Sequence, residues 1–568
     1  MLRPGAEKSI ILVGLFNRFN NFTWEMDFLF KRYAARLKNE FHGYNAAALG
    51  KDVMAGLTVT AVALPLALAF GVSCGASAAA GLVTAILAGL IISALSGASY
   101  QISGPTGAMS AILIGIVAKD GLQNVFIVSF LAGGIMLLCA LFKLGRLVRM
   151  IPRPVITGFT SGIAVIIALG QVDNFFGTVS EGGSALEKLV SYGHLGFKPD
   201  VPTVLLGLLV VVVMIVWPKK WGAVVPASLV GIILSTAVSV VFRMDVATVG
   251  EIPKTLFLSD RLNFAAFDMA KLGSYLSPAV SIAALGIIES LLCGASASRM
   301  KNESFDADVE LVAQGVGNMI IPLFGGVPAT AAIARTSVAI KSGCVTRVCG
   351  IVHALGLLAS MFLLGPVMAL LPLSALAGVL MVTAWRMNEW SSIRYFFGKG
   401  FRGACAKFLI TMLATVVFDL TVAILIGIGF SAVLFILRSS KLSTELAKVE
   451  NDRFRGEANV ESTHGNAYVL YVTGPIFFLN VGALEQAVAA PPSDCGEYIF
   501  SMRGVPAVDT TGVAALDELV ERLQNRGVRV LFCGLNDNVR AMLERGGVLT
   551  TLGENAVFRS VDRALLEV

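Results

Sequence analysis

A long uncharged segment is the feature that most constrains this sequence. No Asp, Glu, Lys or Arg occurs between Met54 and Ala118, and apolar runs of membrane length recur as far as Leu437. Charged residues make up only 14% of the chain, whereas a soluble domain has about a quarter. Continuous apolar runs predict a polytopic α-helical membrane protein, because a transmembrane barrel would show alternation instead.

Fourteen apolar segments are candidate spans, and two of them are unusually short. The approximate limits are 52–73, 77–97, 104–118, 123–142, 151–171, 202–217, 223–242, 276–298, 308–323, 329–341, 346–365, 367–385, 404–418 and 419–438. Segments 104–118 and 329–341 are too short to cross a hydrocarbon core of about 30 Å at about 1.5 Å per residue. They come third and tenth, so they occupy matching places in two halves of seven.

Helix-breaking residues precede both short segments. The first break is "SGPTGAMSA" (Ser103–Ala111) and the second is "FGGVPATAAIA" (Phe324–Ala334). Paired interruptions at matching places are typical of transporters built from inverted repeats, whose substrate site lies at the interrupted helices. The alternative is two independent proline kinks, which are common in membrane helices.

Two helices that begin inside a membrane create a site for an anion. Their first amides lack partners, and the helix dipoles place partial positive charge there. The candidate donors are the backbone amides of Thr106, Gly107 and Ala108 on one side, and of Thr330, Ala331 and Ala332 on the other. The two threonine hydroxyls either donate to the anion as well or cap their own helices.

Two strongly ionisable residues look truly intramembrane, because they lie within apolar segments and away from the charged ends of the predicted spans. Glu289 lies near the middle of the eighth span and Arg335 lies just inside the tenth. Intramembrane ionisable residues are functional candidates: Glu289 as a proton carrier, because apolar surroundings favour the protonated carboxyl, and Arg335 as positive potential for the anion. The alternative is a structural Glu289–Arg335 ion pair. Phe70, in the first span, is either an apolar wall of the site or a packing residue.

The distribution of basic residues predicts the topology. With a cytosolic N-terminus, the clusters Lys143–Arg153, Lys219/Lys220, Arg299/Lys301, Lys341/Arg347 and Arg386–Arg402 all fall inside, as the positive-inside rule requires. The net charge of +6 is therefore a signal of membrane topology and gives no indication of nucleic-acid binding. The four histidines and eight cysteines show no metal or redox spacing, so we expect no cofactor, metal or catalytic residues.

The chain divides into four predicted parts. Residues 1–50 are a cytosolic region with an amphipathic helix from Phe28 to Phe41, expected to pack on the protein rather than to anchor it to lipid. Residues 51–438 are the transmembrane region and residues 439–460 a linker. Residues 461–568 alternate strand and helix patterns, so they predict a small α/β domain.

Several of these motifs together resemble the SulP anion permeases. The landmarks are "AVALPLALAFG" (Ala61–Gly71), "SGPTGAMS" (Ser103–Ser110), "PRPVITGFTSGIAV" (Pro152–Val165), "ELVAQGVGNMIIPLFGGVPATAAIARTSVAIKSG" (Glu310–Gly343) and "TVVFDLTVAILIGIGFSAVLFILR" (Thr415–Arg438). The resemblance implies a seven-plus-seven inverted repeat, with core and gate domains, that moves as an elevator. It also implies substrate between spans three and ten, a cytosolic C-terminal STAS domain, a homodimer, and a transporter rather than an enzyme.

Details of the resemblance bear on substrate and coupling. The segments "GIIESLLCG" and "TAAIARTS" look most like those of bacterial aerobic C4-dicarboxylate members. Sodium-coupled bicarbonate members have Asp at the position of Glu289 and Thr one turn later, where this chain has Cys293, a poor ligand for a hard cation. Proton coupling is therefore favoured. In the STAS domain, Asp509-Thr510 matches a turn that is phosphorylated in related domains; a structural turn capped by Asp509 is the preferred interpretation over regulation at Thr510.

The sequence thus predicts proton-coupled symport of a small anion across a bacterial inner membrane. The candidate substrates are a C4-dicarboxylate, sulfate and bicarbonate, and a regulator bound to the STAS domain is a further candidate partner. The alternatives are an uncoupled channel or exchanger, a nucleobase permease of the same fold, and a membrane scaffold that transports nothing.

Overall fold

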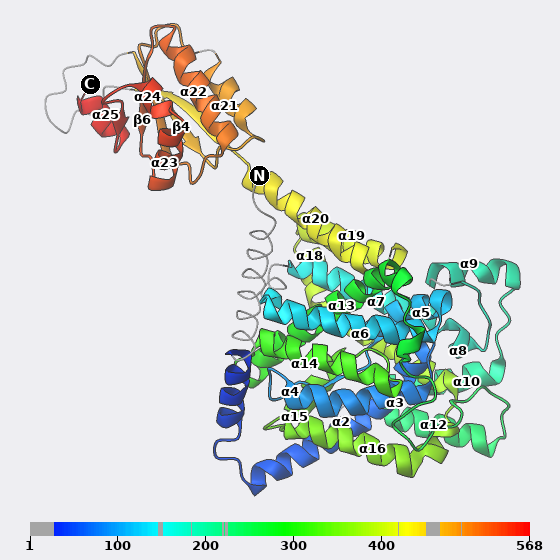
Figure 1. The fold of residues 1–568 in the computed structure, drawn as a ribbon. Coiled ribbons are helices and arrows are strands. Elements are labelled where there is room, and N and C mark those ends of the chain that lie inside the picture. Colours follow the sequence, from blue (N-terminus) through cyan, green and yellow to red (C-terminus); the bar gives the residue numbers. More distant parts are fainter. Residues whose placement is uncertain are drawn as a thin grey trace, which may run out of the picture. The chain divides into compact units, whose positions relative to one another are not determined.

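The computed structural model describes residues 28–145, 151–182, 185–218, 221, 225–418, 420–449, 466–489 and 491–567. Contacts divide the chain into two compact units, Met1–Gly429 and Phe430–Val568. The first unit is helical and the second contains the main sheet (Figure 1). Each unit is described by itself.

A helix forms within each of the fourteen predicted spans. The first seven are α2 (Ala46–Ser73), α3 (Ala78–Leu87) continued by η1 (Ala88–Ile92) and α4 (Ser93–Leu95), α5 (Gly107–Asp120), α6 (Leu122–Leu141), α7 (Arg153–Gly170), α10 (Val201–Val216) and α12 (Ala227–Val241). The second seven are α13 (Leu272–Lys301), α14 (Ala307–Ile320), α15 (Ile333–Lys341), α16 (Val348–Ala369), α17 (Leu373–Met387), α19 (Arg402–Val417) and α20 (Leu420–Ser439). Among the described residues, seven helices are long and apolar enough to cross a membrane alone, and α10, α12 and α17 are shorter apolar helices.

Two groups of helices make up the first unit. In one group α2 packs on α3 and α16, while α6 packs on α13 and α14; in the other, α7 packs on α19, and α10 on α12 and α17. Small residues allow close helix contacts: a Cβ added to Gly133 of α6 would lie 2.6 Å from the carbonyl oxygen of Gly315 of α14. Further short helices are α8 (Val172–Phe176), α9 (Ala185–Leu195), α18 (Trp390–Gly398) and the 3-10 turns η3 (Phe264–Ala266), η4 (Met269–Lys271) and η5 (Ile321–Phe324).

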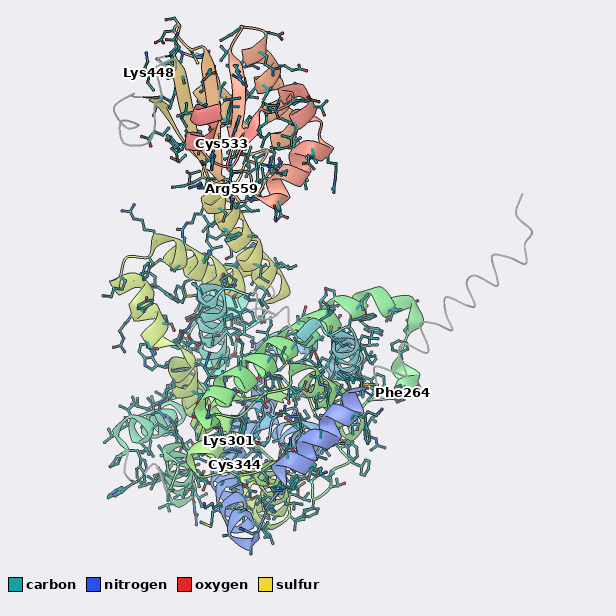
Figure 2. The ribbon with its side chains drawn as sticks, turned by 90° about the vertical axis from the view of Figure 1, so that its left-hand side faces the viewer. Phe264, Lys301, Cys344, Lys448, Cys533 and Arg559 are labelled. Carbon is teal, nitrogen blue, oxygen red and sulfur yellow. The ribbon has the colours of Figure 1, made fainter. Side chains whose placement is uncertain are left out.

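The predicted amphipathic helix packs on the protein. Residues 28–40 are helical, and Arg32 forms ion pairs with Asp306 (2.5 Å) and Asp308 (3.2 Å). Glu40 forms a buried ion pair with Arg347 at 2.7 Å. At the same end of the unit, Lys301 donates to the carbonyl oxygen of Val345 at 2.6 Å, which places it beside Cys344 (Figure 2). Residues 1–27 of the predicted cytosolic region lie outside the described residues.

The second unit contains a five-stranded sheet. Its order is β3-β4-β5-β6-β7, with β3 antiparallel to β4 and the other neighbours parallel. The strands are β3 (Ser443–Lys448), β4 (Ala467–Thr473), β5 (Glu497–Gly504), β6 (Arg529–Cys533) and β7 (Val557–Phe558), and the helices are α21 (Val481–Val488), α22 (Thr510–Gln524), α23 (Asp537–Arg545), α24 (Val548–Leu552) and α25 (Val561–Glu567). Lys448 and Cys533 mark β3 and β6 in Figure 2.

Strand β3 corrects part of the predicted linker. Residues 443–448 lie within the segment 439–460, yet they pair along their whole length with β4. The segment is polar because β3 is an edge strand whose residues are mostly exposed or half-buried. Composition therefore resembled that of a linker, although the backbone hydrogen bonds belong to the sheet. Residues 450–465 of the predicted linker lie outside the described residues.

Candidate functional site

Two short strands bring the interrupted helices together. β1 (Ser103–Gly104) precedes α5, and β2 (Thr330–Ala331) precedes α15. They pair antiparallel, with Ser103 opposite Ala331 and Gly104 opposite Thr330. Antiparallel pairing of equivalent segments is the relation that two inverted halves require. Both helices therefore begin next to one small ladder inside the protein.

Thr106 closes the N-terminus of α5 and contacts the acidic residue predicted for coupling. Its hydroxyl oxygen accepts from the amide of Met109 at 3.3 Å, and the hydroxyl donates to Oε2 of Glu289 at 2.9 Å. Glu289 lies on α13 and is partly buried. Thr106 therefore caps its helix, as one of the two alternatives had it, while donation from its hydroxyl to an anion stays a prediction.

The first two amides of α5 remain available. Among the described residues, neither the amide of Gly107 nor that of Ala108 donates a hydrogen bond. A Cβ at Gly107 would lie 3.1 Å from the ring of Phe70 and would collide with Ile167 of α7. Phe70 is itself buried. A larger residue at position 107 would therefore displace Ile167, and Phe70 forms an apolar surface beside Gly107.

The predicted donors on the α15 side are largely occupied. The amide of Ala332 donates to the carbonyl oxygen of Ile102 at 3.0 Å, and that of Ala331 to the hydroxyl of Ser290 at 3.3 Å. The Thr330 hydroxyl lies 2.8 Å from the Ser290 hydroxyl and 3.3 Å from the carbonyl oxygen of Gly286, its acceptor. In this structure these groups hold the loop in place, because they are already hydrogen-bonded to β1 and to α13 and are not free to bind an anion.

The open amides of this half-helix begin at Ile333, three residues later than the predicted start at Thr330. Ala332 is the N-cap of α15 and makes no side-chain capping bond. Ile333 and Ala334, the first residues of the helix, are exposed in this unit. Among the described residues, neither of their amides has an acceptor. The open helix end on this side is therefore at Ile333 and Ala334.

Arg335 crosses from α15 to the other half-helix. Its side chain is 1% exposed, and Nη2 donates to the carbonyl oxygen of Pro105 at 2.7 Å. Nη1 is buried and has no partner among the described residues. A Cβ at Gly104 would collide with Nη1, so any other residue there would force the guanidinium to move. The structure thus supplies a buried cation with free hydrogen-bonding capacity between the two half-helices.

The structural ion pair between Glu289 and Arg335 is not present. No Glu289–Arg335 contact within 4.0 Å occurs among the ion pairs of the described residues. Each side chain bonds to the turn that begins α5 instead, Glu289 to Thr106 and Arg335 to Pro105. The alternative that these residues only neutralise each other was therefore wrong.

Three polar residues on α14 hold the ladder, and the sequence analysis missed them. Glu310, Gln314 and Asn318 are spaced four residues apart and are fully buried, so they lie on one helix face. Gln314 Nε2 donates to the Ser103 hydroxyl (2.9 Å) and to Glu310 (2.8 Å). Asn318 accepts from the Ala329 amide at 2.8 Å and donates to its carbonyl oxygen at 2.9 Å. Their helical spacing in an apolar span was the signal that could have identified them.

A cavity of about 580 Å³ extends along α5 from this site. It is lined by residues of α2, α5, α7, α13 and α19, including Ser110, Lys119, Ile167, Ser277 and Val416. Ile167 is also the neighbour of Gly107, so the cavity begins about one helical turn from the α5 amides. Its size is sufficient for a small anion with several waters.

The turn at Asp509 is a helix cap. Asp509 Oδ1 accepts from the Gly512 amide at 2.8 Å, and Oδ2 accepts from the Phe478 amide at 3.1 Å. Thr510, the first residue of α22, is exposed. The structural interpretation of this turn therefore agrees with the geometry, while modification of Thr510 stays a prediction.

Comparison with known proteins identifies the family. Residues 49–409 match the sulfate permease family, and residues 458–564 match the STAS domain. The chain belongs to the sulfate permease family. The second unit of the chain is a STAS domain. The family and the relatives of this chain are named as transporters rather than enzymes.

Two relatives cover nearly the whole chain. A Bacillus subtilis protein named "Putative sulfate transporter YvdB" is 35% identical over 541 residues, which is 92% of this chain and 98% of the relative. The bicarbonate transporter BicA of Picosynechococcus is 30% identical over 534 residues, covering 90% of this chain and 92% of the relative. This permease is therefore a multi-pass membrane protein of an anion-transporting family.

Solved structures share the fold. The transmembrane domain of a cyanobacterial BicA superposes with a TM-score of 0.62 and 29% identity, covering 68% of this chain and 99% of that chain. Murine solute carrier 26 member A9, in the inward-facing state, superposes with a TM-score of 0.80 over 95% of this chain and 94% of that chain. At 17% identity the second likeness concerns the fold alone.

Proposed function

We propose that this permease carries a small oxyanion together with a proton. The observation that carries the proposal is the bond between Thr106, the N-cap of α5, and Glu289 of α13. A titratable carboxyl thus lies at the end of the half-helix where the anion would be held. The candidate substrates are sulfate, bicarbonate and a C4-dicarboxylate; the names of the relatives support the first two, and the resemblance of two segments supports the third.

The anion would be held by the open helix ends and Arg335. The donors are the amides of Gly107 and Ala108 on α5, and those of Ile333 and Ala334 on α15. Arg335 adds a buried positive charge whose Nη1 is free among the described residues. Phe70 excludes water on one side. Charge-assisted hydrogen bonds of this kind are about twice as strong as neutral ones.

Electrostatics then couples anion and proton. Ionised Glu289 would repel an anion at the α5 amides: two unit charges about 4 Å apart repel by about 4 kcal/mol at an effective dielectric of about 20. This is about a thousandfold in affinity, so the anion binds preferentially when Glu289 is protonated. The empty carrier loses the proton and the Thr106 hydroxyl again donates to the carboxylate.

A sodium ion fits this site less well than a proton. Cys293 lies one turn after Glu289, is fully buried, and its thiol donates to the Thr336 hydroxyl at 3.4 Å. Na⁺ prefers oxygen ligands, as hard cations do, and a thiol is a poor substitute. The groups around Glu289 therefore favour proton coupling.

An elevator motion agrees with how the site is supported. α5 packs on α6 and α13, and α15 packs on α2 and α13, so both half-helices belong to one group of helices. On the other side, α5 contacts α7 near Gly107 and Ile167. We propose that the group of helices containing α5 and α15 slides past the group containing α7 and α19 while it carries the bound anion and proton.

We propose a bacterial inner-membrane location, with residues 1–50 and the STAS domain in the cytosol. The positive-inside distribution of Lys and Arg supports this orientation. A homodimer and a regulator bound to the STAS domain are proposed from the family resemblance. The boundaries 51–438 and 461–568 are proposed for the two functional domains, with β3 added to the second.

Two other functions predict different chemistry. A nucleobase permease of this fold would place acidic residues on both α13 and α15, whereas α15 has Arg335. An uncoupled channel or exchanger has no need of Glu289 beside the α5 N-terminus. Uptake by the Glu289→Gln variant therefore distinguishes an uncoupled channel or exchanger from a proton-coupled symporter.

The experiment is uptake by purified protein in proteoliposomes. Labelled sulfate, bicarbonate and succinate are each supplied with and without an inward proton gradient. We expect one of them to accumulate with the gradient in the wild type, and Glu289→Gln to lose that dependence while still exchanging anion down its own gradient. Glu251→Gln, in an exposed loop, is the matched control. Gradient-independent uptake by the wild type, or unchanged coupling in Glu289→Gln, would contradict the proposal.

A further inference from the structure

α18 is a nine-residue helix between the apolar helices α17 and α19. At about 1.5 Å per residue it is far too short to cross a membrane. It packs on α19 and on α7, and Figure 1 labels it near the start of α19. Because α18 joins the end of one apolar span to the start of the next, we infer that it lies at the membrane boundary.

The outer side of α18 and its flanks is aromatic. Ser392 and Phe396 are buried against the protein. The exposed aromatic side chains are Trp385 (65% exposed), Tyr395 (56%), Phe397 (47%) and Phe401 (46%). Such residues gather at membrane–water interfaces, where an apolar ring and a polar edge are both satisfied.

The same segment carries cations without carboxylate partners. Arg394, Lys399 and Arg402 are exposed, and among the described residues no ion pair or side-chain hydrogen bond involves them. No Asp or Glu occurs between Trp390 and Phe418. The nearest carboxylate, Glu389, is engaged by Arg153, Thr157 and Ser392.

The helix formed by residues 28–40 provides an internal contrast. There the cations Arg32 and Arg347 are matched by Asp306, Asp308 and Glu40. In those intramolecular contacts, each cation has a carboxylate partner within the same unit. On α18 the counter-charge is absent from the described residues, so we look for it outside the protein.

We propose that α18, with Phe401 and Arg402, docks the phosphate headgroups of anionic phospholipids in the adjoining leaflet. The aromatic rings insert at the depth of the headgroups and the three cations contact the phosphates, as in interfacial amphipathic helices. Each cation near an anionic surface strengthens binding about fivefold. The three together therefore give about a 100-fold preference for anionic over zwitterionic lipid. This surface is separate from the anion site at α5 and α15.

Tryptophan quenching tests the proposal at the helix itself. In full-length protein with Trp24, Trp217 and Trp221 replaced by Phe, the remaining Trp385 and Trp390 report lipid next to α18. Vesicles contain brominated phosphatidylglycerol competing with phosphatidylcholine, or the reverse. We expect a strong preference for phosphatidylglycerol that weakens as salt is raised, and a preference near one in the variant Arg394→Gln/Lys399→Gln/Arg402→Gln.

Matched controls separate lipid docking from other outcomes. The variant Lys198→Gln/Lys254→Gln/Lys271→Gln removes three exposed charges elsewhere and should keep the full preference. The single variants Arg394→Gln and Lys399→Gln should each lower it in part, which covers failure of the triple variant to fold. Soluble glycerol phosphate should not displace the lipid. A preference near one in the wild type, an unchanged preference in the triple variant, or displacement by glycerol phosphate would overturn the proposal.

Discussion

The two half-helices begin at one ladder, yet their N-termini are finished differently. α5 has a side-chain cap, Thr106, which also contacts the carboxyl of Glu289. α15 has Ala332 at its N-cap and no side-chain cap, but carries Arg335 in its first turn. One end is therefore linked to a group that changes charge, and the other to a group that keeps its charge.

Under the proposed proton coupling, this difference would assign anion attraction to one half of the repeat and proton dependence to the other. A fixed cation attracts the anion in every state, because an arginine stays protonated. In the proposed mechanism, the carboxyl at the opposite end would make anion binding depend on a proton. Two identical ends would give either a permanent anion site or none, so the departure from symmetry is where coupling would arise.

Removing the fixed cation is expected to have the largest effect. Arg335→Gln leaves the Pro105 carbonyl oxygen and the anion without a charged donor. Hydrogen bonds to charged groups are worth about 1.5–3 kcal/mol, so we expect the apparent affinity for the anion to fall about tenfold to 100-fold. Uptake at varied anion concentration measures this.

Arg335→Lys is the control for charge alone. Lysine keeps a cation but not the planar fork that reaches both Pro105 and the site, so partial recovery is expected. Unchanged affinity in Arg335→Gln, with normal thermal stability, would show that the buried cation is not part of the anion site.

Removing the cap of α5 is expected to have the next largest effect. Thr106→Val loses both the bond to Met109 and the bond to Glu289. A lost N-cap costs about 1 kcal/mol, and the lost contact with Glu289 adds to it, so we expect about tenfold slower gradient-driven uptake. Thr106→Ser keeps the hydroxyl and should restore most of it. If valine and serine behave alike, the Thr106–Glu289 bond has no part in coupling.

The elements of this molecule were largely predictable, but the contacts between them were not. Each predicted span contains a helix because apolar runs and Gly-Pro breaks are local signals. The matching places of the two breaks indicated that they form one site. The individual contacts, which are the β1–β2 register, the Thr106–Glu289 bond and the Arg335–Pro105 bond, join residues far apart in the chain and could not be read from a single sequence. For the same reason the occupied amides of Ala331 and Ala332 were expected to be free. The edge strand β3 was missed because its polar residues resemble those of a linker.

Giving α15 the cap it lacks should sharpen the contrast between the two ends. Ala332 has the extended backbone of an N-cap (φ −108°, ψ 116°), so Ala332→Ser can bond to the first-turn amides without strain. A new cap is worth about 1 kcal/mol. We expect the substrate-free protein to melt at a higher temperature and the anion to bind about fivefold more weakly, because it competes with the serine hydroxyl. Ala514→Ser, at an exposed position inside α22, is the control; tighter anion binding in Ala332→Ser would contradict this assignment of the open end.

A third helix start, that of α22 in the STAS domain, is capped by a side chain that uses both of its oxygens. Both carboxylate oxygens of Asp509 are used, one for Gly512 at the start of α22 and one for Phe478. Asp509→Ala should therefore cost about 1 kcal/mol locally, which corresponds to about fivefold faster hydrogen exchange of the α22 amides in the full-length protein. Thr510→Val should leave hydrogen exchange unchanged. Neither variant should alter gradient-driven uptake by more than about twofold, because the N-termini of α5 and α15 at the anion site are not changed. A loss of uptake in Asp509→Ala as large as that in Thr106→Val would mean that this turn regulates transport, and that its cap is more than a structural device.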